Sequence, residues 1–282
     1  MLPPDITKIV FKMIPVSVVI ITKNETEYIA GCLKMAKLIT DDIVIIDNGS
    51  TDDTLQIAAK YGCRVYQYAW DGYGANKNKG IELANYDWIL SIDADEVPDM
   101  ELVNSLHNLW LRNTEMVYDI KFRSYFGKKR IRFGTWGRDH HIRLFNRTVV
   151  KWSEPIVHET LILPKQIRKQ TLKGYFHHHS VKDTGECNSK AVYYAKLSAE
   201  KYFQSGKKAS MINLYLSPIF VFVKNYLLLL GFLDGKEGWN IARITYKNRW
   251  LKYHYLSRLE NNYKNKPVIK SNFAVDMKLQ QY

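Results

Sequence analysis

Residues 16–25 read V-S-V-V-I-I-T-K-N-E, a nearly continuous apolar run that ends in polar side chains. β-Branched residues dominate the run, and apolar and polar positions do not alternate, which is typical of a strand buried on both faces of a parallel sheet. Similar runs recur along the first half of the chain. They lie at residues 43–46, 63–68 and 87–92.

Helix-forming residues separate these runs, at residues 25–38, 54–61 and 76–85. Thr51 or Asp52 is placed to cap the second of these helices. Strands that alternate with helices in this way indicate an α/β sandwich with a mostly parallel central sheet. Ligands of such sheets bind beyond the carboxyl ends of the strands, so the polar residues after each run are candidates for function.

The pattern changes from about residue 116, where the β-like runs become shorter, and a helical pattern returns before a basic, aromatic C-terminal part. The shorter runs lie at residues 117–122, 130–133, 141–146 and 160–163, and the helical pattern at residues 188–204. We place a domain boundary near Gly206, which divides the chain into residues 1–206 and a helical region of residues 207–282.

The net charge of +13 is distributed unevenly over the 282 residues. Residues 1–120 carry 10 basic and 18 acidic side chains, whereas residues 121–151 carry 10 and 1, and residues 207–282 carry 13 and 4. A basic second half fits either a nucleic acid or an anionic membrane surface. The acidic first half argues against the nucleic acid.

The cysteines and the N-terminus bear on the cellular compartment. Cys32, Cys63 and Cys187 form no C-x-x-C pair, and their odd number argues against a disulfide framework, so we expect a reducing environment. Charged residues interrupt the short apolar pieces of residues 1–14, which therefore lack the apolar core of a secretory signal. Together these features favour a cytoplasmic location.

Two aspartates directly follow the fourth apolar run. Asp93 and Asp95 are two residues apart, so on an extended segment they point the same way. Paired carboxylates provide hard oxygen ligands for Mg²⁺ or Mn²⁺, and Mg²⁺ favours one or two carboxylates together with substrate phosphates. A D-x-D sequence alone is more often a solvated acidic turn, but its position after a fourth α/β strand favours the metal site.

The ends of the other runs are also polar. Residues 22–25 read T-K-N-E and residues 47–52 read D-N-G-S-T-D, which offer hydrogen bonds to a nucleobase or ribose, although each also fits a turn or helix cap. Residues 72–80, G-Y-G-A-N-K-N-K-G, are neither a dinucleotide fingerprint nor a P-loop. Lys77 and Lys79 suit a pyrophosphate as point charges or, equally well, a solvated helix start.

These motifs, in this order, resemble family 2 glycosyltransferases with the GT-A fold. The likeness rests on V-S-V-V-I-I-T-K-N-E, I-V-I-I-D-N-G-S-T-D-D-T, A-N-K-N-K-G and W-I-L-S-I-D-A-D-E, within residues 14–105. Further along, K-W-S-E-P-I-V-H-E, H-H-S and Y-L-L-L-L-G-F-L-D-G look like the bacterial subgroup that adds glucose to the lipopolysaccharide inner core. This extends the resemblance to about residue 260.

The resemblance implies a nucleotide-sugar donor, with UDP-glucose suggested by the subgroup, a divalent metal, Mg²⁺ or Mn²⁺, and inversion at the anomeric carbon. Lys79 would lie near the nucleotide, Asp93 would face the ribose and sugar, and Asp95 would bind the metal that bridges the diphosphate. The residues implied to line the nucleoside site are Thr22, Asn24, Glu25 and Asp47.

An inverting reaction needs a general base for the acceptor hydroxyl. Glu159 is the first candidate, Asp139 and Glu154 are alternatives, and an ordinary salt-bridged carboxylate is the competing interpretation of Glu159. Three adjacent histidines, residues 177–179, cannot all face one ion. His178 matches the H-x-S pattern of the subgroup and would complete the metal site; His158 is its competitor, and a strand-end histidine bound to backbone or phosphate is the other interpretation.

The C-terminal region favours a membrane surface. Pro218, Lys224 and Asn225 argue against a bilayer span in residues 211–233, and the polar residues Asn213, Ser217 and Lys224 fall on one narrow helical stripe. We expect a helix that lies in the membrane interface; the alternatives are a buried helix of a bundle and a helix that spans the bilayer. Residues 236–260 mix cations with aromatic rings, which suits lipid headgroups or a packed aromatic helix face.

The sequence thus predicts a metal-dependent, inverting glycosyltransferase, peripheral on the inner face of the cell membrane. Its acceptor would be a lipopolysaccharide core or another lipid-linked glycan, and the basic residues 121–151 would meet an anionic acceptor or form a loop that closes over the donor. A sugar-phosphate nucleotidyltransferase, which releases pyrophosphate, is the alternative enzyme. A basic nucleic-acid-binding protein is the non-enzymatic alternative, and it leaves Asp93 and Asp95 without a function.

Overall fold

Four parallel strands, formed by the apolar runs of the first half, make one side of the central sheet. The computed structural model describes residues 13–154 and 159–264. The four strands are β1 (Val16–Thr22), β2 (Ile43–Asp47), β3 (Arg64–Gln67) and β4 (Trp88–Asp93), in the order β3-β2-β1-β4. Every residue of β1 and β2 is buried, which explains why their sequences show no alternation.

The other side of the sheet is mixed. β8 (His140–Asn146) runs antiparallel to β4, and β6 (Met116–Phe126), β11 (Arg168–Val181) and β5 (Glu96–Pro98) follow it in the sheet order. β11 is parallel to β6 and antiparallel to β5. The short strands are β7 (Lys129–Arg130), which pairs with β6, and the two-stranded sheet of β9 (Lys151–Trp152) and β10 (Leu161–Ile162).

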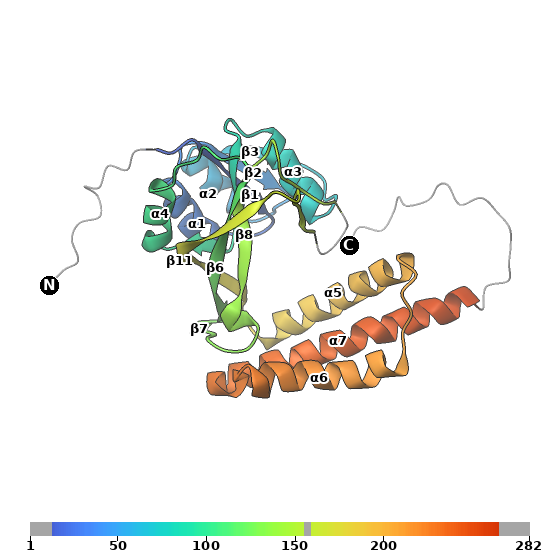
Figure 1. The fold of residues 1–282 in the computed structure, drawn as a ribbon. Coiled ribbons are helices and arrows are strands. Elements are labelled where there is room, and N and C mark those ends of the chain that lie inside the picture. The colour runs from blue at the N-terminus through green and yellow to red at the C-terminus, as the bar shows by residue number, and fades with distance from the viewer. Residues whose placement is uncertain (1–12, 155–158, 265–282) are drawn as a thin grey trace, which may run out of the picture.

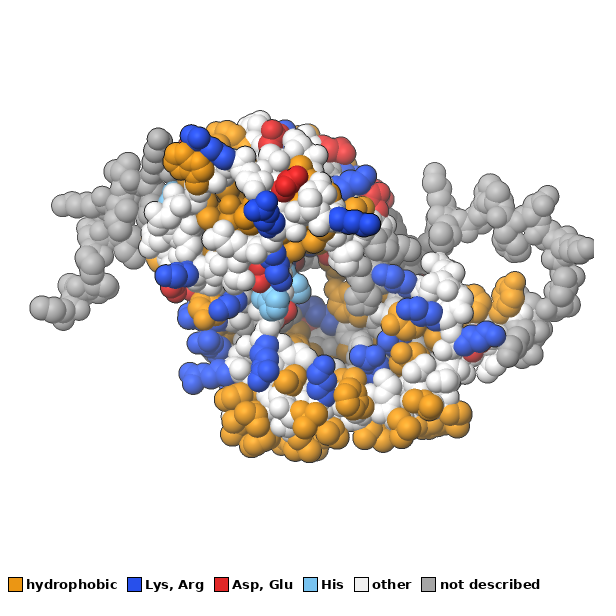
Figure 2. Space-filling view, in the orientation of Figure 1, with side chains coloured by type: hydrophobic (Ala, Val, Ile, Leu, Met, Phe, Trp, Pro, Cys, Tyr) orange, Lys and Arg blue, Asp and Glu red, His pale blue; other side chains and the backbone are white. Residues whose placement is uncertain are grey.

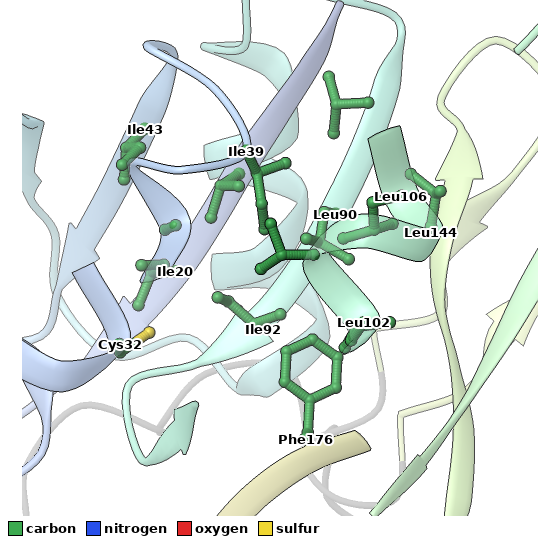
Figure 3. Packing of buried hydrophobic residues seen from close by; sticks show 14 of the residues in the cluster. Ile20, Cys32, Ile39, Ile43, Leu90, Ile92, Leu102, Leu106, Leu144 and Phe176 are labelled. Carbon is green, nitrogen blue, oxygen red and sulfur yellow. The ribbon is translucent and has the colours of Figure 1, made fainter. Parts of the chain in front are cut away.

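Helices cover both faces of the sheet (Figure 1). α1 (Ile29–Ala36), α2 (Thr54–Lys60) and α4 (Met100–His107) pack on one face, and α3 (Tyr73–Glu82) packs on the other. Figure 3 shows the first of these cores, where Ile20 and Leu90 of the strands lie among side chains of α1 and α4. The predicted α/β sandwich of GT-A type is confirmed.

Three helices begin at residues other than those predicted, and one of them, Thr184–Gln204, begins four residues before the predicted residue 188. α1 begins at Ile29 rather than at residue 25, because residues 24–26 donate their backbone N–H groups to Ser50, Thr54 and Asp52 of the segment after β2. α3 begins at Tyr73, three residues before the predicted start. It lies close on β1 because Gly80 has no side chain. A Cβ atom at this position would stand only 2.4 Å from a methyl group of Val19.

A buried carboxylate, Asp42, joins the amino-terminal ends of the parallel strands. It accepts hydrogen bonds from Ser17, from Arg64 and from both the backbone and the side chain of Asn85. Burial alone would raise the pKa of Asp42, but these hydrogen bonds outweigh burial and hold the pKa below its ordinary value.

Asp42→Asn is expected to lower the free energy of unfolding by about 2 kcal/mol at neutral pH, because a charged acceptor of several hydrogen bonds is lost. The depressed pKa means that this contribution is present above the unfolded pKa of about 3.9 and is lost as the pH falls through the lower folded value. Urea unfolding at neutral and acidic pH measures both effects. The exposed neighbour Asp41 supplies the control, Asp41→Asn, and equal losses in both variants would contradict the prediction.

The C-terminal helices form a separate layer under the sheet (Figure 1). It contains α5 (Thr184–Gln204), α6 (Ser217–Val223) between π-helical turns at Ile212–Leu216 and Lys224–Leu228, and α7 (Gly235–Lys264). Ala199 of α5 packs against Tyr253 and Leu256 of α7. α5, which precedes the boundary placed near Gly206, therefore packs with the helices that follow it.

Large apolar side chains remain exposed along this layer, and Figure 2 shows them gathered at its lower edge. We call them the apolar face: Met211, Ile212, Tyr215, Leu216, Ile219, Phe220, Leu227, Leu228, Phe232 and Leu233. Within residues 13–154 and 159–264, no single helix is long and apolar enough to cross a bilayer. Ile212–Leu228 and Gly231–Tyr263, which are bent by 70°, satisfy that criterion only as a pair.

Candidate active site

The loops after β1 and β2 are joined by hydrogen bonds at the carboxyl end of the sheet. The fully buried Asp47 accepts the N–H groups of Gly49 and Ser50, each at 3.0 Å. Asn24, with φ 56°, accepts the N–H of Thr51 at 2.8 Å. Thr22 pairs in register with Asp47, and its hydroxyl is buried without a hydrogen-bond partner among the described residues. This leaves a polar group available to a ligand at the strand end.

A cavity of about 450 Å³ continues from these loops toward the end of β4. Asn24, Glu25 and Asp95 line it, together with the cations Lys182 and Lys190. Burial first, and then the nearby charge of Asp95, raise the pKa of Glu25 to about 7. The structure thus brings two of the predicted nucleoside-site residues, Asn24 and Glu25 of the loop after β1, and the predicted metal ligand Asp95 together at one cavity.

Lys79, the remaining predicted nucleotide contact, lies farther along this sheet edge. It pairs with Asp71, and its ammonium group stands 5.0 Å from the ring centre of Tyr68. The backbone N–H of Tyr68 donates to the carbonyl of Asp47. Lys79 therefore contacts Asp47 only indirectly, through Tyr68. Its role in nucleotide binding stays a prediction.

Asp93 lies between two buried cations. Its carboxylate is 3.3 Å from Nζ of Lys77 and 3.2 Å from the guanidinium of Arg143, and Arg143 also contacts the buried Glu96. Burial would raise the pKa of Asp93, but the charges of Lys77 and Arg143 outweigh burial and hold it well below its usual range. Asp93 therefore stays ionised at any physiological pH.

Lys77 connects Asp93 with the predicted base. Its ammonium group is 3.1 Å from Oε1 of Glu159 and 4.6 Å from the ring centre of Trp152, and the residue is only 3% exposed. α3 and the segment after β9 can approach closely because Gly74 has no side chain. A Cβ atom at this position would stand only 1.9 Å from the carbonyl oxygen of Ser153. Lys77 is thus a buried bridge between two carboxylates.

The other two candidate bases have different partners. Glu154 accepts a hydrogen bond from Asn78 of α3 at 2.9 Å, and Asp139 pairs with His141 at 2.9 Å. Burial would raise the pKa of Asp139, but the hydrogen bond and charge of His141 outweigh burial and lower it. Of the three candidates, Glu159 is the one joined to Asp93 through a shared partner.

The three adjacent histidines of β11 point in alternate directions. Nε2 of His178 lies 3.4 Å from Oδ2 of Asp95, whereas His177 contacts the hydroxyl of Tyr125, and His179 stacks on the rings of Tyr28 and Tyr125. Burial would lower the pKa of His178, but the hydrogen bond and charge of Asp95 outweigh burial and raise it to about 9. The competitor His158 lies outside the described residues.

Asp95 and His178 fit a divalent ion as a pair of protein ligands. No three His, Cys, Asp or Glu side chains gather as a metal site in the part of the chain that the structure describes. Two ligands on one ion with bonds of about 2.1 Å stand roughly 3 Å apart, close to the observed 3.4 Å. Since Mg²⁺ binds through one or two protein groups plus substrate phosphates, two protein ligands suffice, and the role of Asp95 and His178 as metal ligands stays a prediction.

Comparison with known proteins identifies the family. The family model "Glycosyl transferase family 2" matches residues 17–169, which hold the strand ends described above together with Glu159 and Asp139. The chain belongs to glycosyl transferase family 2.

Three bacterial proteins are similar to this glycosyltransferase. An uncharacterised glycosyltransferase of Rickettsia typhi is 30% identical over 278 residues, covering 93% of this chain and 94% of the relative. The lipopolysaccharide core biosynthesis glycosyltransferase LpsC of Rhizobium meliloti is 27% identical, covering 82% and 90%. A solved glucosyl-3-phosphoglycerate synthase of Mycobacterium tuberculosis, in complex with Mn²⁺ and UDP-glucose, is 25% identical over 39% of this chain and 43% of its own, with a TM-score of 0.32.

Sequence reasoning missed two buried residues of this glycosyltransferase site, Arg143 and Glu96, and it gave Lys77 a different role. The sequence signal that could have identified Arg143 is its position in a strand, where this charged residue stands between the apolar residues Ile142 and Leu144. β8 pairs directly with β4, which carries this arginine to Asp93. Lys77 was predicted to suit a pyrophosphate, but in the structure its ammonium group forms ion pairs with Asp93 and Glu159.

Proposed function

We propose that this family 2 glycosyltransferase is metal-dependent and inverting, and that it moves a sugar, glucose, from UDP-glucose to a lipopolysaccharide-core or other lipid-linked glycan. The observation that carries the proposal is the end of β4. There Asp95 faces His178 while Asp93 is joined through Lys77 to Glu159. The pair of Asp95 and His178 suits a metal-bound diphosphate. The pair of Asp93 and Glu159 suits the sugar and the attacking hydroxyl.

On the donor side, the strand-end residues bind and orient the nucleotide sugar. The free hydroxyl of Thr22 and the loops held by Asn24 and Asp47 border the nucleoside, with Glu25 and Lys79 beside it. Asp95 and His178 would hold Mg²⁺ or Mn²⁺, which supplies positive charge for the diphosphate that leaves.

On the acceptor side, the reaction is one displacement with inversion. The acceptor oxygen forms a bond to the anomeric carbon as the bond from that carbon to the diphosphate breaks. The carboxylate of Glu159 takes the hydroxyl proton, while Lys77 fixes that carboxylate relative to Asp93.

A donor screen tests the proposal. The protein is incubated with Mn²⁺, a bacterial lipid-linked glycan and UDP-glucose, UDP-galactose or GDP-mannose, and the products are separated. Release of UDP together with a glycan heavier by one hexose is expected. Release of pyrophosphate would instead indicate a nucleotidyltransferase, and the anomeric configuration of the product tests inversion.

We also propose that the protein works as a peripheral protein on an anionic membrane, at its cytoplasmic face. The apolar face is broad and exposed, with Phe220 61% and Leu228 65% exposed. Residues 207–282 carry 13 basic and 4 acidic side chains, and this excess complements an anionic lipid surface.

Leu216→Ser, Phe220→Ser and Leu228→Ser in one chain are expected to weaken vesicle binding by about 100-fold, because three exposed apolar anchors are lost. The measurement is flotation with vesicles of phosphatidylethanolamine and phosphatidylglycerol, compared with phosphatidylcholine alone. The matched control replaces Trp110, Ile162 and Leu163, which are exposed elsewhere, by serine. Unchanged flotation of the first variant, or an equal loss in the control, would remove the apolar face as the contact.

A further inference from the structure

A second cavity, of about 620 Å³, lies beside the candidate active site between β6, β11 and the segment after β7. Its lining carries an excess of positive charge. Four of its lining residues are the exposed cations Lys121, Arg130, Arg132 and Arg138.

These four cations form no ion pair with a carboxylate of the described residues. Within residues 13–154 and 159–264, the structure shows no ion pair to any of them, and Asp139, the one carboxylate in the lining, is already paired with His141. Cations gathered around one cavity repel each other, and an anion that enters relieves this repulsion. Guanidinium groups also bind phosphate and carboxylate through two parallel hydrogen bonds.

The cavity borders the reacting groups. Phe122 lines it, and the ring of Phe122 lies 5.8 Å from the ring of His178 and 5.4 Å from the guanidinium of Arg143, measured from ring centres. The ring of Phe122 therefore separates a ligand in this cavity from His178 on one side and from Arg143, the partner of Asp93, on the other. The donor loops lie at the other cavity, so this one faces the acceptor side.

The cavity is also fixed to the helical layer. Asp234, which is buried, accepts the N–H groups of Arg132 at 3.1 Å and Phe133 at 2.8 Å. Asn225, also buried, accepts the N–H of Thr135 at 3.0 Å. These side chains come from the segment that carries the apolar face. The wall of the cavity is therefore hydrogen-bonded to the segment that carries that face.

We propose that this cavity binds an anionic substituent, a phosphate or a carboxylate, on an acceptor sugar adjacent to the hydroxyl that reacts. The inference rests on the proposed glycosyltransferase reaction and adds the chemical class of its acceptor. Lys121, Arg130, Arg132 and Arg138 hold the anion, while the attachment to Asp234 and Asn225 sets its distance from the lipid surface.

Titration with small sugars tests the inference. The full-length protein, loaded with UDP and Mn²⁺, is titrated with mannose 6-phosphate, glucuronate and neutral mannose. Binding of mannose 6-phosphate identifies a phosphate site, and binding of glucuronate alone identifies a carboxylate site. Mannose is expected to bind at least tenfold more weakly than the preferred anion, and equal binding of all three sugars would overturn the inference.

Variants place the site. Arg130→Gln, Arg132→Gln and Arg138→Gln in one chain are expected to weaken binding of the anionic sugar at least tenfold and to raise the acceptor KM, with UDP affinity unchanged. The matched control, with Lys34, Lys60 and Lys165 replaced by Gln, loses the same charge at exposed positions elsewhere. Wild-type binding in the first variant, or an equal loss in the control, would overturn the inference.

The two proposals fail separately. If the wild-type protein transfers no sugar from any donor, the proposed function fails, while the binding titration still reports on the cavity. If transfer proceeds and the three-arginine variant keeps both its acceptor KM and its binding of the anionic sugar, only the cavity assignment fails. The single variant Arg132→Gln, at an exposed side chain, serves where the triple variant folds poorly.

Discussion

Asp95→Asn is expected to lower kcat by about a thousandfold while the protein stays folded, because the variant loses the charged oxygen ligand that faces His178. The substitution keeps the size of the side chain, and Asp95 contributes no apolar contact to the core. The leaving diphosphate would then gain charge without the ion that Asp95 and His178 are proposed to hold. The measurements are turnover with saturating donor, and Mn²⁺ binding by electron paramagnetic resonance.

A matched control flanks the opposite end of β4. Asp87 precedes β4 at its opposite end and pairs with Arg147 on the surface, so Asp87→Asn is expected to keep near-normal turnover and Mn²⁺ binding. Thermal unfolding of both variants separates loss of fold from loss of chemistry. Asp95→Asn with more than a tenth of the normal turnover and with normal Mn²⁺ binding would remove Asp95 as a metal ligand.

Glu159→Gln is expected to lower kcat between about 100-fold and 10,000-fold, the range that a positioned general base contributes. The amide keeps an oxygen toward Lys77, so the bridge to Asp93 and the affinity for the donor are expected to change little. Turnover and the donor dissociation constant, measured on the same preparation, give the required comparison. A base lowers turnover, whereas a purely structural residue would lower stability and donor affinity together.

Glu154→Gln is the control for this substitution, since Glu154 lies five residues earlier and Gln can still accept the hydrogen bond of Asn78. A normal rate in Glu159→Gln would pass the role to Glu154 or Asp139, and Asp139→Asn decides between them. If all three variants keep their turnover, proton removal by a carboxylate of this set is wrong.

The parallel half of the sheet could be predicted because its strands are buried on both faces. In β1 and β2 the nearly uninterrupted apolar residues report the burial of the whole strand, including the polar Ser17, and the strand ends then place Asn24, Asp47 and Asp93 at one edge. β11 could not be predicted in this way. Its sequence, R-K-Q-T-L-K-G-Y-F-H-H-H-S-V, holds few apolar residues, and it is extended because β6 and β5 provide hydrogen bonds along it.

The proximity of two predicted site residues could be anticipated where one residue type implies one chemistry. Asp95 and His178 carry metal-binding groups whatever surrounds them, and the structure places them 3.4 Å apart. Lys77 and Arg143 are different, because a buried cation is stable only beside the carboxylates that compensate it. Those partners lie far away along the chain, and no local pattern connects them.

The long sequence separations in this site have a consequence for folding. Asp93 and Arg143 are 50 residues apart, and Lys77 and Glu159 are 82 residues apart, so each pair closes a long loop of chain. Loops of that length close late, once the surrounding tertiary structure is in place. Because β11 also carries His178 to Asp95, a chain emerging from the ribosome completes this arrangement only after β11 has been synthesised.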